Sequence, residues 1–119
     1  MKNHVYWMLE LEIQPGREQD FRVLMNEMVT ATLANEPGTL TYEWSISEDG
    51  RMCHIFEEYT DSAATLVHLG NFGEKYAARF LEILSPKRFM IYGSPDQQVK
   101  DALAAFGAVY MQFAEGFKR

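Results

Sequence analysis

Apolar and polar residues alternate along three stretches of the chain, and this period of two is typical of a β-strand with one buried face. The stretches span residues 4–13, 39–47 and 51–59. One face of the first stretch carries Val5, Trp7, Leu9, Leu11 and Ile13. Asp49 and Gly50 separate the second and third stretches, and such a pair favours the tight turn of a β-hairpin. The pattern therefore predicts one strand and, later in the chain, a hairpin of two more.

In two other regions the apolar period changes to that of an amphipathic helix. The first region, residues 17–33, ends before Pro37 and Gly38, because proline disfavours helical geometry at the preceding residue and glycine allows a tight turn. The second region follows the hairpin and begins at Thr60 or Asp61, either of which can cap a helix. It continues, with one break, to the next predicted strand.

A fourth strand is predicted from the apolar run in residues 85–95, which is bounded by Pro86 and Pro95. The order of elements is then β-α-β-β-α-β, with the second helix in two pieces. This order is that of the ferredoxin-like α+β fold with its split βαβ arrangement.

The remaining chain predicts one more helix and one more strand. Pro95 and Asp96 are a favourable helix start, since proline fits the first helical turn. The helix is expected to end at Gly107, and a short strand is predicted over residues 108–113. We therefore expect a ferredoxin-like domain at residues 1–93 and a helix–strand extension at residues 94–119.

Both faces of the predicted sheet carry apolar side chains, although two helices cover only one face. The opposed positions include Trp7 against Tyr6 and Met8, and Ile91 against Met90 and Tyr92. A second apolar face implies a second cover. A twofold homodimer that packs sheet on sheet, with the extension reaching its interface, supplies that cover. The alternative is a monomer whose tail folds back over its own sheet.

Composition and charge exclude several classes of protein. The chain has 119 residues and a net charge of −6, and an acidic surface repels the phosphate backbone of nucleic acids. No apolar run is long enough to cross a bilayer. Polar and charged residues are interleaved from the second residue onward, which predicts no signal peptide. We expect a soluble cytoplasmic domain that binds neither nucleic acid nor membrane.

The spacing of reactive residues predicts no metal site and no familiar cofactor. The three histidines have no short paired spacing with carboxylates or cysteine, and Cys53 and His54 point to opposite faces of one strand. Cys53, the single cysteine, is expected to be a small buried residue and forms no internal disulfide. Neither a glycine-rich phosphate loop nor a nucleophile elbow is present.

A candidate site follows from the strand and helix around residues 51–68. Glu57 and Tyr59 share one face of the predicted strand, because they are two residues apart. In the following helix, His68 shares a face with Ala64 and Val67 and is therefore directed inward. The strand–helix turn brings the carboxylate, the phenol and the imidazole around one small volume. Such an imidazole has a tunable pKa, which a general base requires.

Purely structural interpretations of the same residues remain open. His68 also fits a hydrogen-bonded core histidine, and Glu57 and Glu58 also fit a sheet edge. Several aromatic residues are packing residues that could equally wall a planar ligand: Trp7, Tyr42 and Trp44.

Three runs, "EPGTLTYEWSISEDG", "IFEEYTDSAATLVHL" and "SPKRFMIYGSP", resemble the antibiotic biosynthesis monooxygenase domain family. The resemblance covers roughly residues 4–93, and the tail is similar to an extension in one branch of the family. Its most specific part is Glu57, an aromatic residue two positions later, and His68. Many members have tryptophan where this chain has Tyr59.

The resemblance implies a homodimeric α+β barrel with one pocket in each subunit, between the sheet and the helices. It further implies a monooxygenase that needs no cofactor and acts with dioxygen on a small hydroxylated aromatic or a quinol. In this interpretation His68 is the base, Glu57 orients it, and the pocket is lined by Tyr59, Trp44, Phe72 and Tyr76.

A second hypothesis keeps the scaffold and changes the chemistry. It is a non-oxidative isomerase that uses His68 and Glu57 as acid and base, or a module that only binds a small ligand. A phosphorylated substrate requires cations near the pocket, for which Lys75, Arg79 and Arg88 are the candidates.

Overall fold

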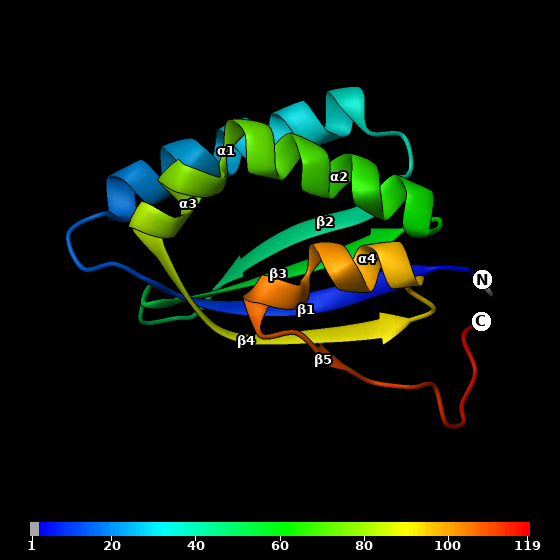
Figure 1. The fold of residues 1–119 in the computed structure, drawn as a ribbon. Helices are drawn as coiled ribbons and strands as arrows, with labels where there is room; N and C mark the ends of the chain where they lie inside the picture. Colours follow the sequence, from blue (N-terminus) through cyan, green and yellow to red (C-terminus); the bar gives the residue numbers. More distant parts are fainter. Residues whose placement is uncertain (1–2) are drawn as a thin grey trace.

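The computed structural model describes residues 3–119 and contains a five-stranded sheet with helices on one side (Figure 1). The elements in chain order are β1 (Val5–Ile13), α1 (Glu18–Asn35), β2 (Thr39–Ile46), β3 (Met52–Tyr59), α2 (Ser62–Lys75), α3 (Ala77–Ile83), β4 (Leu84–Gly93), α4 (Gln97–Ala102), the 3₁₀-helix η1 (Ala104–Phe106) and β5 (Val109–Tyr110). The first seven follow the predicted ferredoxin-like order, with the second helix interrupted at Tyr76.

The sheet has the strand order β2-β3-β1-β4-β5. β1 lies in the middle and pairs antiparallel with β3 and β4, and β2 pairs antiparallel with β3. In this register Glu57 of β3 lies between Trp7 of β1 and Tyr42 of β2. The centre of the sheet therefore surrounds the candidate carboxylate with aromatic side chains.

Two clusters of buried residues form the core between the sheet and the helices. The first is built around α1, α3 and β3, and includes Phe21, Leu24, Ile55 and Phe80. The second joins α4 to β1, β3 and β4, and includes Trp7, Tyr59, Phe89, Val99 and Leu103. The alternation predicted for β1 is confirmed, since Val5, Trp7, Leu11 and Ile13 are buried.

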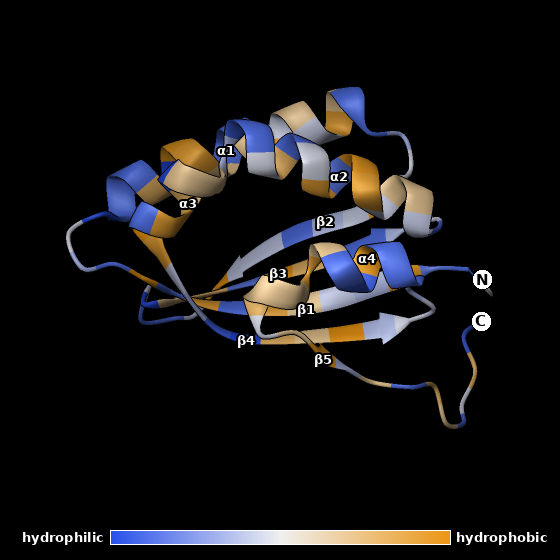
Figure 2. Ribbon diagram, viewed as in Figure 1, coloured by the Kyte–Doolittle hydropathy of each residue, from blue (hydrophilic) through white to orange (hydrophobic). Residues whose placement is uncertain are grey.

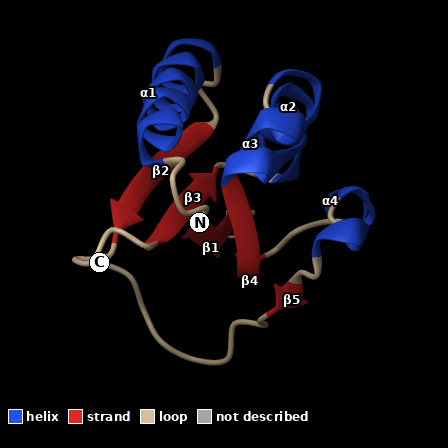
Figure 3. Ribbon diagram, turned by 90° about the vertical axis from the view of Figure 1, so that its left-hand side faces the viewer, coloured by secondary structure: helices blue, strands red, loops and turns tan. Residues whose placement is uncertain are grey.

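The extension first packs on the same side of the sheet as the other helices (Figure 3). Asp96 caps α4 by accepting a hydrogen bond from the backbone N–H of Val99 at 2.9 Å, as predicted for this helix start. The predicted strand 108–113 is shorter, since only Val109–Tyr110 pair, in parallel with β4 of the same chain. The predicted helix divides into α4 and η1 before Gly107, which has a positive φ of 67°.

The rest of the chain runs below the opposite face of the sheet and ends near the side of β2 (Figures 1 and 3). On this open face Tyr6 stacks on Tyr92 with ring centroids 5.4 Å apart. Figure 2 shows apolar stretches in the C-terminal segment as well, where Phe113 and Phe117 are 73% and 80% exposed. The tail thus folds back beneath its own sheet without burying its own rings.

No helix within residues 3–119 combines the length and the apolar character needed to cross a membrane.

Candidate functional site

Glu57 and Tyr59 lie on the face of β3 that is turned toward the helices. Cys53, Ile55, Glu57 and Tyr59 are all buried on this face, as the alternation predicts. Glu57 is only 4% exposed and Tyr59 is fully buried. A buried carboxylate needs polar partners, because its charge is otherwise costly to remove from water.

His68 reaches this carboxylate from the second turn of α2. Asp61, rather than Thr60, caps the helix by accepting a hydrogen bond from the N–H of Ala64 at 2.8 Å. A Cβ added to Gly38 would lie 2.6 Å from the Cβ of Ala64, so glycine there permits the close approach of α2 to the loop before β2. The helix is thereby held close enough for an inward histidine to meet β3.

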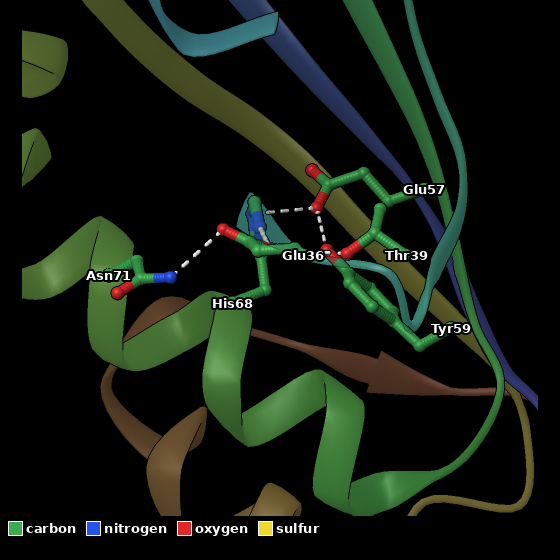
Figure 4. A network of polar contacts seen from close by, with 6 residues as sticks. All are labelled: Glu36, Thr39, Glu57, Tyr59, His68 and Asn71. Carbon is green, nitrogen blue, oxygen red and sulfur yellow. Dashed lines mark hydrogen bonds and ion pairs between the residues drawn. The ribbon is translucent and has the colours of Figure 1, made fainter. Parts of the chain in front are cut away.

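The imidazole of His68 lies between two carboxylates (Figure 4). Its Nδ1 is 2.8 Å from Oε1 of Glu36, and its Nε2 is 3.2 Å from Oε1 of Glu57. The hydroxyl of Tyr59 donates a hydrogen bond to the same oxygen of Glu57. Glu57, Tyr59 and His68, which were predicted to lie together, do lie together in the structure. Glu36 is a fourth member of the cluster.

Glu36 is the residue that sequence reasoning misses, since the pattern around it indicates only the end of a helix. It follows α1, is 7% exposed, and accepts hydrogen bonds from Asn71 Nδ2 and Thr39 Oγ1, each at 3.1 Å (Figure 4). An acidic residue at a helix C-terminus is electrostatically unfavourable. Its presence beside Pro37 is therefore the one local signal that this position has another role.

The two carboxylates determine the charge of His68. Burial alone lowers the pKa of the imidazole, but the hydrogen bonds and charges of Glu36 and Glu57 outweigh burial and raise this pKa to about 9. For Glu36, burial raises the pKa of the carboxyl, but the hydrogen bond and charge of His68 bring it below its ordinary value. At pH 7 His68 therefore carries a positive charge, whereas the sequence predicts that it acts as the base.

Two phenols next to the imidazole remain neutral. Burial, and then the charge of Glu57, raises the pKa of Tyr59 well above its ordinary value, and the same two causes raise the pKa of Tyr42. Their ring centroids lie 5.4 Å and 5.3 Å from that of His68. Tyr59 is thus a fixed hydrogen-bond donor to Glu57, where the resemblance leads one to expect a substrate-lining ring.

An apolar cavity of about 330 Å³ adjoins the cluster. His68 lines it, whereas Glu36, Glu57 and Tyr59 are not among its lining residues. The sheet contributes Trp7, Leu9, Pro86 and Phe89, the helices α2 and α3 contribute Leu69, Phe72, Phe80 and Leu81, and the extension contributes Leu103, Ala105 and Phe106. A charged imidazole is therefore presented to an apolar space that the extension helps to enclose.

Of the four residues expected to line a substrate pocket, Phe72 lines this cavity, whereas Tyr59, Trp44 and Tyr76 are not among its lining residues. Trp44 and Tyr76 instead pack against the first core cluster, and Trp44 lies beside Phe21 and Phe80 with ring centroids 5.9 Å and 6.3 Å away. Cys53 and His54, which also carry reactive side chains, are not among the residues that line the cavity. Cys53 is buried, which raises its pKa to about 12, and His54 contacts Glu10 at 2.9 Å on the opposite face.

Together these features define a ferredoxin-like α+β protein with a buried histidine–carboxylate cluster beside an apolar cavity. The family model of the antibiotic biosynthesis monooxygenases matches residues 5–84. The chain therefore belongs to the antibiotic biosynthesis monooxygenase family, as its motifs suggested. No curated protein matches the sequence.

Solved structures share the fold. MupZ from Pseudomonas fluorescens is 25% identical, with a TM-score of 0.84 over 98% of this chain and 95% of its own. Rv0793 from Mycobacterium tuberculosis is also 25% identical, with a TM-score of 0.67 over 80% of this chain and 98% of its own. SnoaB, a cofactor-independent oxygenase from Streptomyces nogalater, is 14% identical, with a TM-score of 0.65 over 80% and 96%. The match to MupZ includes the extension, because it covers nearly the whole chain.

Proposed function

We propose that this protein is a cofactor-independent monooxygenase of small hydroxylated aromatic compounds or quinols. The observation that carries the proposal is a buried imidazolium, held between two carboxylates, at the wall of an apolar cavity. Membership of the family and the likeness to SnoaB in fold support an oxygenase of this kind.

The reaction begins when the substrate hydroxyl enters between His68 and Glu57. The Nε2–Oε1 contact is the longer of the two histidine contacts, 3.2 Å against 2.8 Å, so it is the one that opens. The hydroxyl then donates to Glu57, which takes the proton, and the phenolate oxygen accepts a hydrogen bond from Nε2–H of His68. Glu36 holds the other nitrogen and keeps the ring in place.

The substrate supplies the electrons. The phenolate transfers one electron to O₂, and the nearby imidazolium stabilises the superoxide anion in the apolar cavity. The two radicals combine to form a carbon–oxygen bond, and the resulting peroxide takes up the proton that Glu57 holds. Loss of water then breaks the O–O bond and the remaining C–H bond at that carbon. One oxygen atom enters the product and the other leaves as water, so the substrate provides both hydrogens of the water and all four electrons that reduce O₂.

We also propose that residues 1–93 form the catalytic domain and that the extension, residues 94–119, lies at the interface of a homodimer. The open face of the sheet carries the stacked pair Tyr6 and Tyr92, and the tail below it exposes Phe113 and Phe117. Burial of these rings favours a second copy on this side. A monomeric mass in solution at micromolar concentration would contradict the dimer.

The alternative is a non-oxidative isomerase or a protein that binds a ligand without chemistry. The isomerase is favoured by the presence of a proton donor and a proton acceptor in one cluster. A phosphorylated substrate is not favoured, because within residues 3–119 the lining of the cavity includes no lysine or arginine. Arg79 contacts Glu27 at 3.0 Å on the surface instead.

Oxygen uptake separates these functions. Metal-stripped protein is tested against a panel of quinols, anthrones and catechols, beside His68→Ala and the more conservative His68→Gln. We expect uptake that needs substrate and His68 but no added cofactor. Full activity of folded His68→Gln would remove the role of the imidazolium, and isomerisation without uptake would favour the alternative.

A further inference from the structure

We infer that the groove between α2 and the extension is a second compartment of the ligand site and binds an unbranched aliphatic chain of the ligand. The inference rests on the proposed function only in taking the adjoining cavity as the place of the ligand's reactive head. It adds a chain to that head, whatever ring system the head contains.

The groove is continuous with the cavity beside His68. It has a volume of about 420 Å³ and lies where α2 and α4 run beside each other (Figures 1 and 3). Leu69, Phe72 and Phe106 line both the groove and the cavity. Phe106 is 47% exposed, so little packing holds this part of the shared wall in place. A molecule that is too long for the cavity therefore meets the groove next.

One face of α2 supplies most of the groove. Leu66, Leu69, Gly70 and Gly73 follow the spacing i, i+3, i+4 and i+7, which places them on one side of the helix. Ala102 of α4 also lines the groove. Side chains normally interdigitate between two neighbouring helices. Here glycine occupies two of the four positions on α2, so the space between the helices stays open.

Neither glycine is required by the backbone or by packing within the chain. Both lie in α2, where glycine is less favourable than alanine, and neither has a positive φ. Beyond the helix's own backbone and the adjacent residues, no atom of the described residues lies within 4 Å of a Cβ added to Gly70 or Gly73. Gly38 differs, because its added Cβ would lie 2.6 Å from that of Ala64. An occupant from outside the chain accounts for the two helical glycines.

The lining of the groove determines the chemistry of this occupant. Within residues 3–119 no polar side chain lines it. From Leu66 to Gly73 the groove follows α2 for about two turns, roughly 10 Å. This is too small for a protein partner, because a stable protein interface buries roughly 800 Å² on each side. A cavity of roughly 150 Å³ holds one benzene, so the groove has room for a chain of at least about six carbons.

Ligands with one head and chains of increasing length test the groove without any turnover. 2-Naphthol and its straight-chain 6-ethyl, 6-butyl and 6-hexyl derivatives are titrated without oxygen, and the naphthol fluorescence reports binding. A fully buried methylene would increase the affinity about fourfold. Because the groove is open on one side, we expect about twofold for each methylene in the wild type, or roughly 15-fold from ethyl to hexyl.

Gly73→Leu places a side chain in the groove and should reduce the gain from ethyl to hexyl to about threefold or less. Glu74→Leu is the matched control, since it adds the same side chain at the next residue, which is exposed and does not line the groove. This control should keep the gain of the wild type. Gly73→Ala should give an intermediate gain and unfold at a higher urea concentration than the wild type.

Three outcomes would overturn the inference: binding of no member of the series, an undiminished gain in folded Gly73→Leu, or an equal loss in Glu74→Leu. A changed molecular mass of Gly73→Leu in solution, with an unchanged chain preference, would assign the groove to a second copy of the chain instead.

A measurement on the wild type covers the case in which Gly73→Leu does not fold. In a ¹H–¹⁵N spectrum, the hexyl derivative should shift the backbone N–H signals of Gly70 and Gly73, and the ethyl derivative should not. Absence of a hexyl-specific shift would contradict the inference. Oxygen uptake is independent of these results, so a failed oxygenase assay with a retained chain preference would reject the reaction and keep the second compartment.

Discussion

Glu57 and Glu58 are adjacent on β3, point to opposite faces of the sheet, and each contacts a histidine. On the inner face, Glu57 lies 3.2 Å from Nε2 of His68. On the open face, Oε2 of Glu58 lies 2.7 Å from Nδ1 of His4. Both carboxylates are largely buried, with exposures of 4% and 8%. The two pairs therefore contain the same groups in different surroundings.

The surroundings decide what each pair can do. The inner histidine has a second carboxylate, Glu36, and faces an apolar cavity. The outer carboxylate also contacts a lysine, since Nζ of Lys118 lies 3.5 Å from Oε2 of Glu58. Burial raises the pKa of Glu58, but the hydrogen bond from His4 and the charge of Lys118 bring it below its ordinary value. The inner pair is a charged site beside a cavity, whereas the outer pair fastens the tail to the sheet.

Replacing each glutamate in turn with neutral glutamine should give the largest change in turnover, and the change should differ strongly between Glu57 and Glu58. Glu57→Gln removes the proposed base, so we expect turnover of a responsive quinol to fall about 10²–10⁴-fold. Glu58→Gln, one residue away on the opposite face, should keep turnover within about threefold at the same folded fraction. Equal losses in the two variants would mean that the inner pair has no special part in the reaction.

The apolar wall of the inner site should also matter to stability. Leu103 is 1% exposed and packs in the second core cluster, so Leu103→Ala should lower the free energy of unfolding by about 2–5 kcal/mol. Leu33 on α1 is 85% exposed, and the same change there should cost less than about 0.5 kcal/mol. Urea unfolding measures both, and similar losses would show that the extension is not part of the core.

The pH dependence of stability should carry the signature of His68. Its pKa is raised from 6.5 to about 9, so its contribution is fully present below pH 6.5 and is lost as pH rises through 9. The loss amounts to roughly 3 kcal/mol. Glu36, whose pKa is lowered from 4.5, contributes in the opposite direction, and its stabilisation is lost as pH falls below that value.

Unfolding in urea at pH 6.5, 8 and 10 measures the alkaline part of this dependence. His68→Gln has no titrating group at that position and should flatten the curve over this range. A wild-type stability that is constant from pH 6.5 to 9 would contradict the raised pKa.

The smallest effect is expected at the outer pair. Lys118 is 63% exposed at its side chain, and exposed ion pairs contribute little. Lys118→Met should change the free energy of unfolding by less than about 1 kcal/mol, with the remaining effect weakened by salt. A loss several times larger in urea unfolding would make the outer pair a main determinant of stability.

The local part of the site could be predicted from the sequence. A period of two in β3 places Glu57 and Tyr59 on one face, and a period of 3.6 in α2 directs His68 toward them. Glu36 could not be found in this way, because it is 32 residues before His68 and only the fold brings them together. The cavity could not be predicted either, because one of its walls comes from the extension, which only the fold brings to this place.

The choice of lining residues shows the same limit. The alternation of residues in β2 places Trp44 on the inward face, as expected of a pocket residue. Its ring nevertheless packs beside Phe21 and Phe80. Periodicity gives the face of a strand on which a residue lies, but not its neighbours across the core. Trp7 illustrates the converse, since its sequence position indicates only a buried ring, whereas the structure shows that it also lines the cavity.

The central claim is that the inner site holds a protonated histidine at neutral pH. With three histidines in the chain, an NMR titration of the imidazole nitrogens assigns each by substitution. We predict that His68 titrates with a pKa of about 9 and that both of its nitrogens carry protons at pH 7. A pKa at or below 6.5, with one nitrogen unprotonated at pH 7, would contradict a site built on a charged imidazole between two carboxylates.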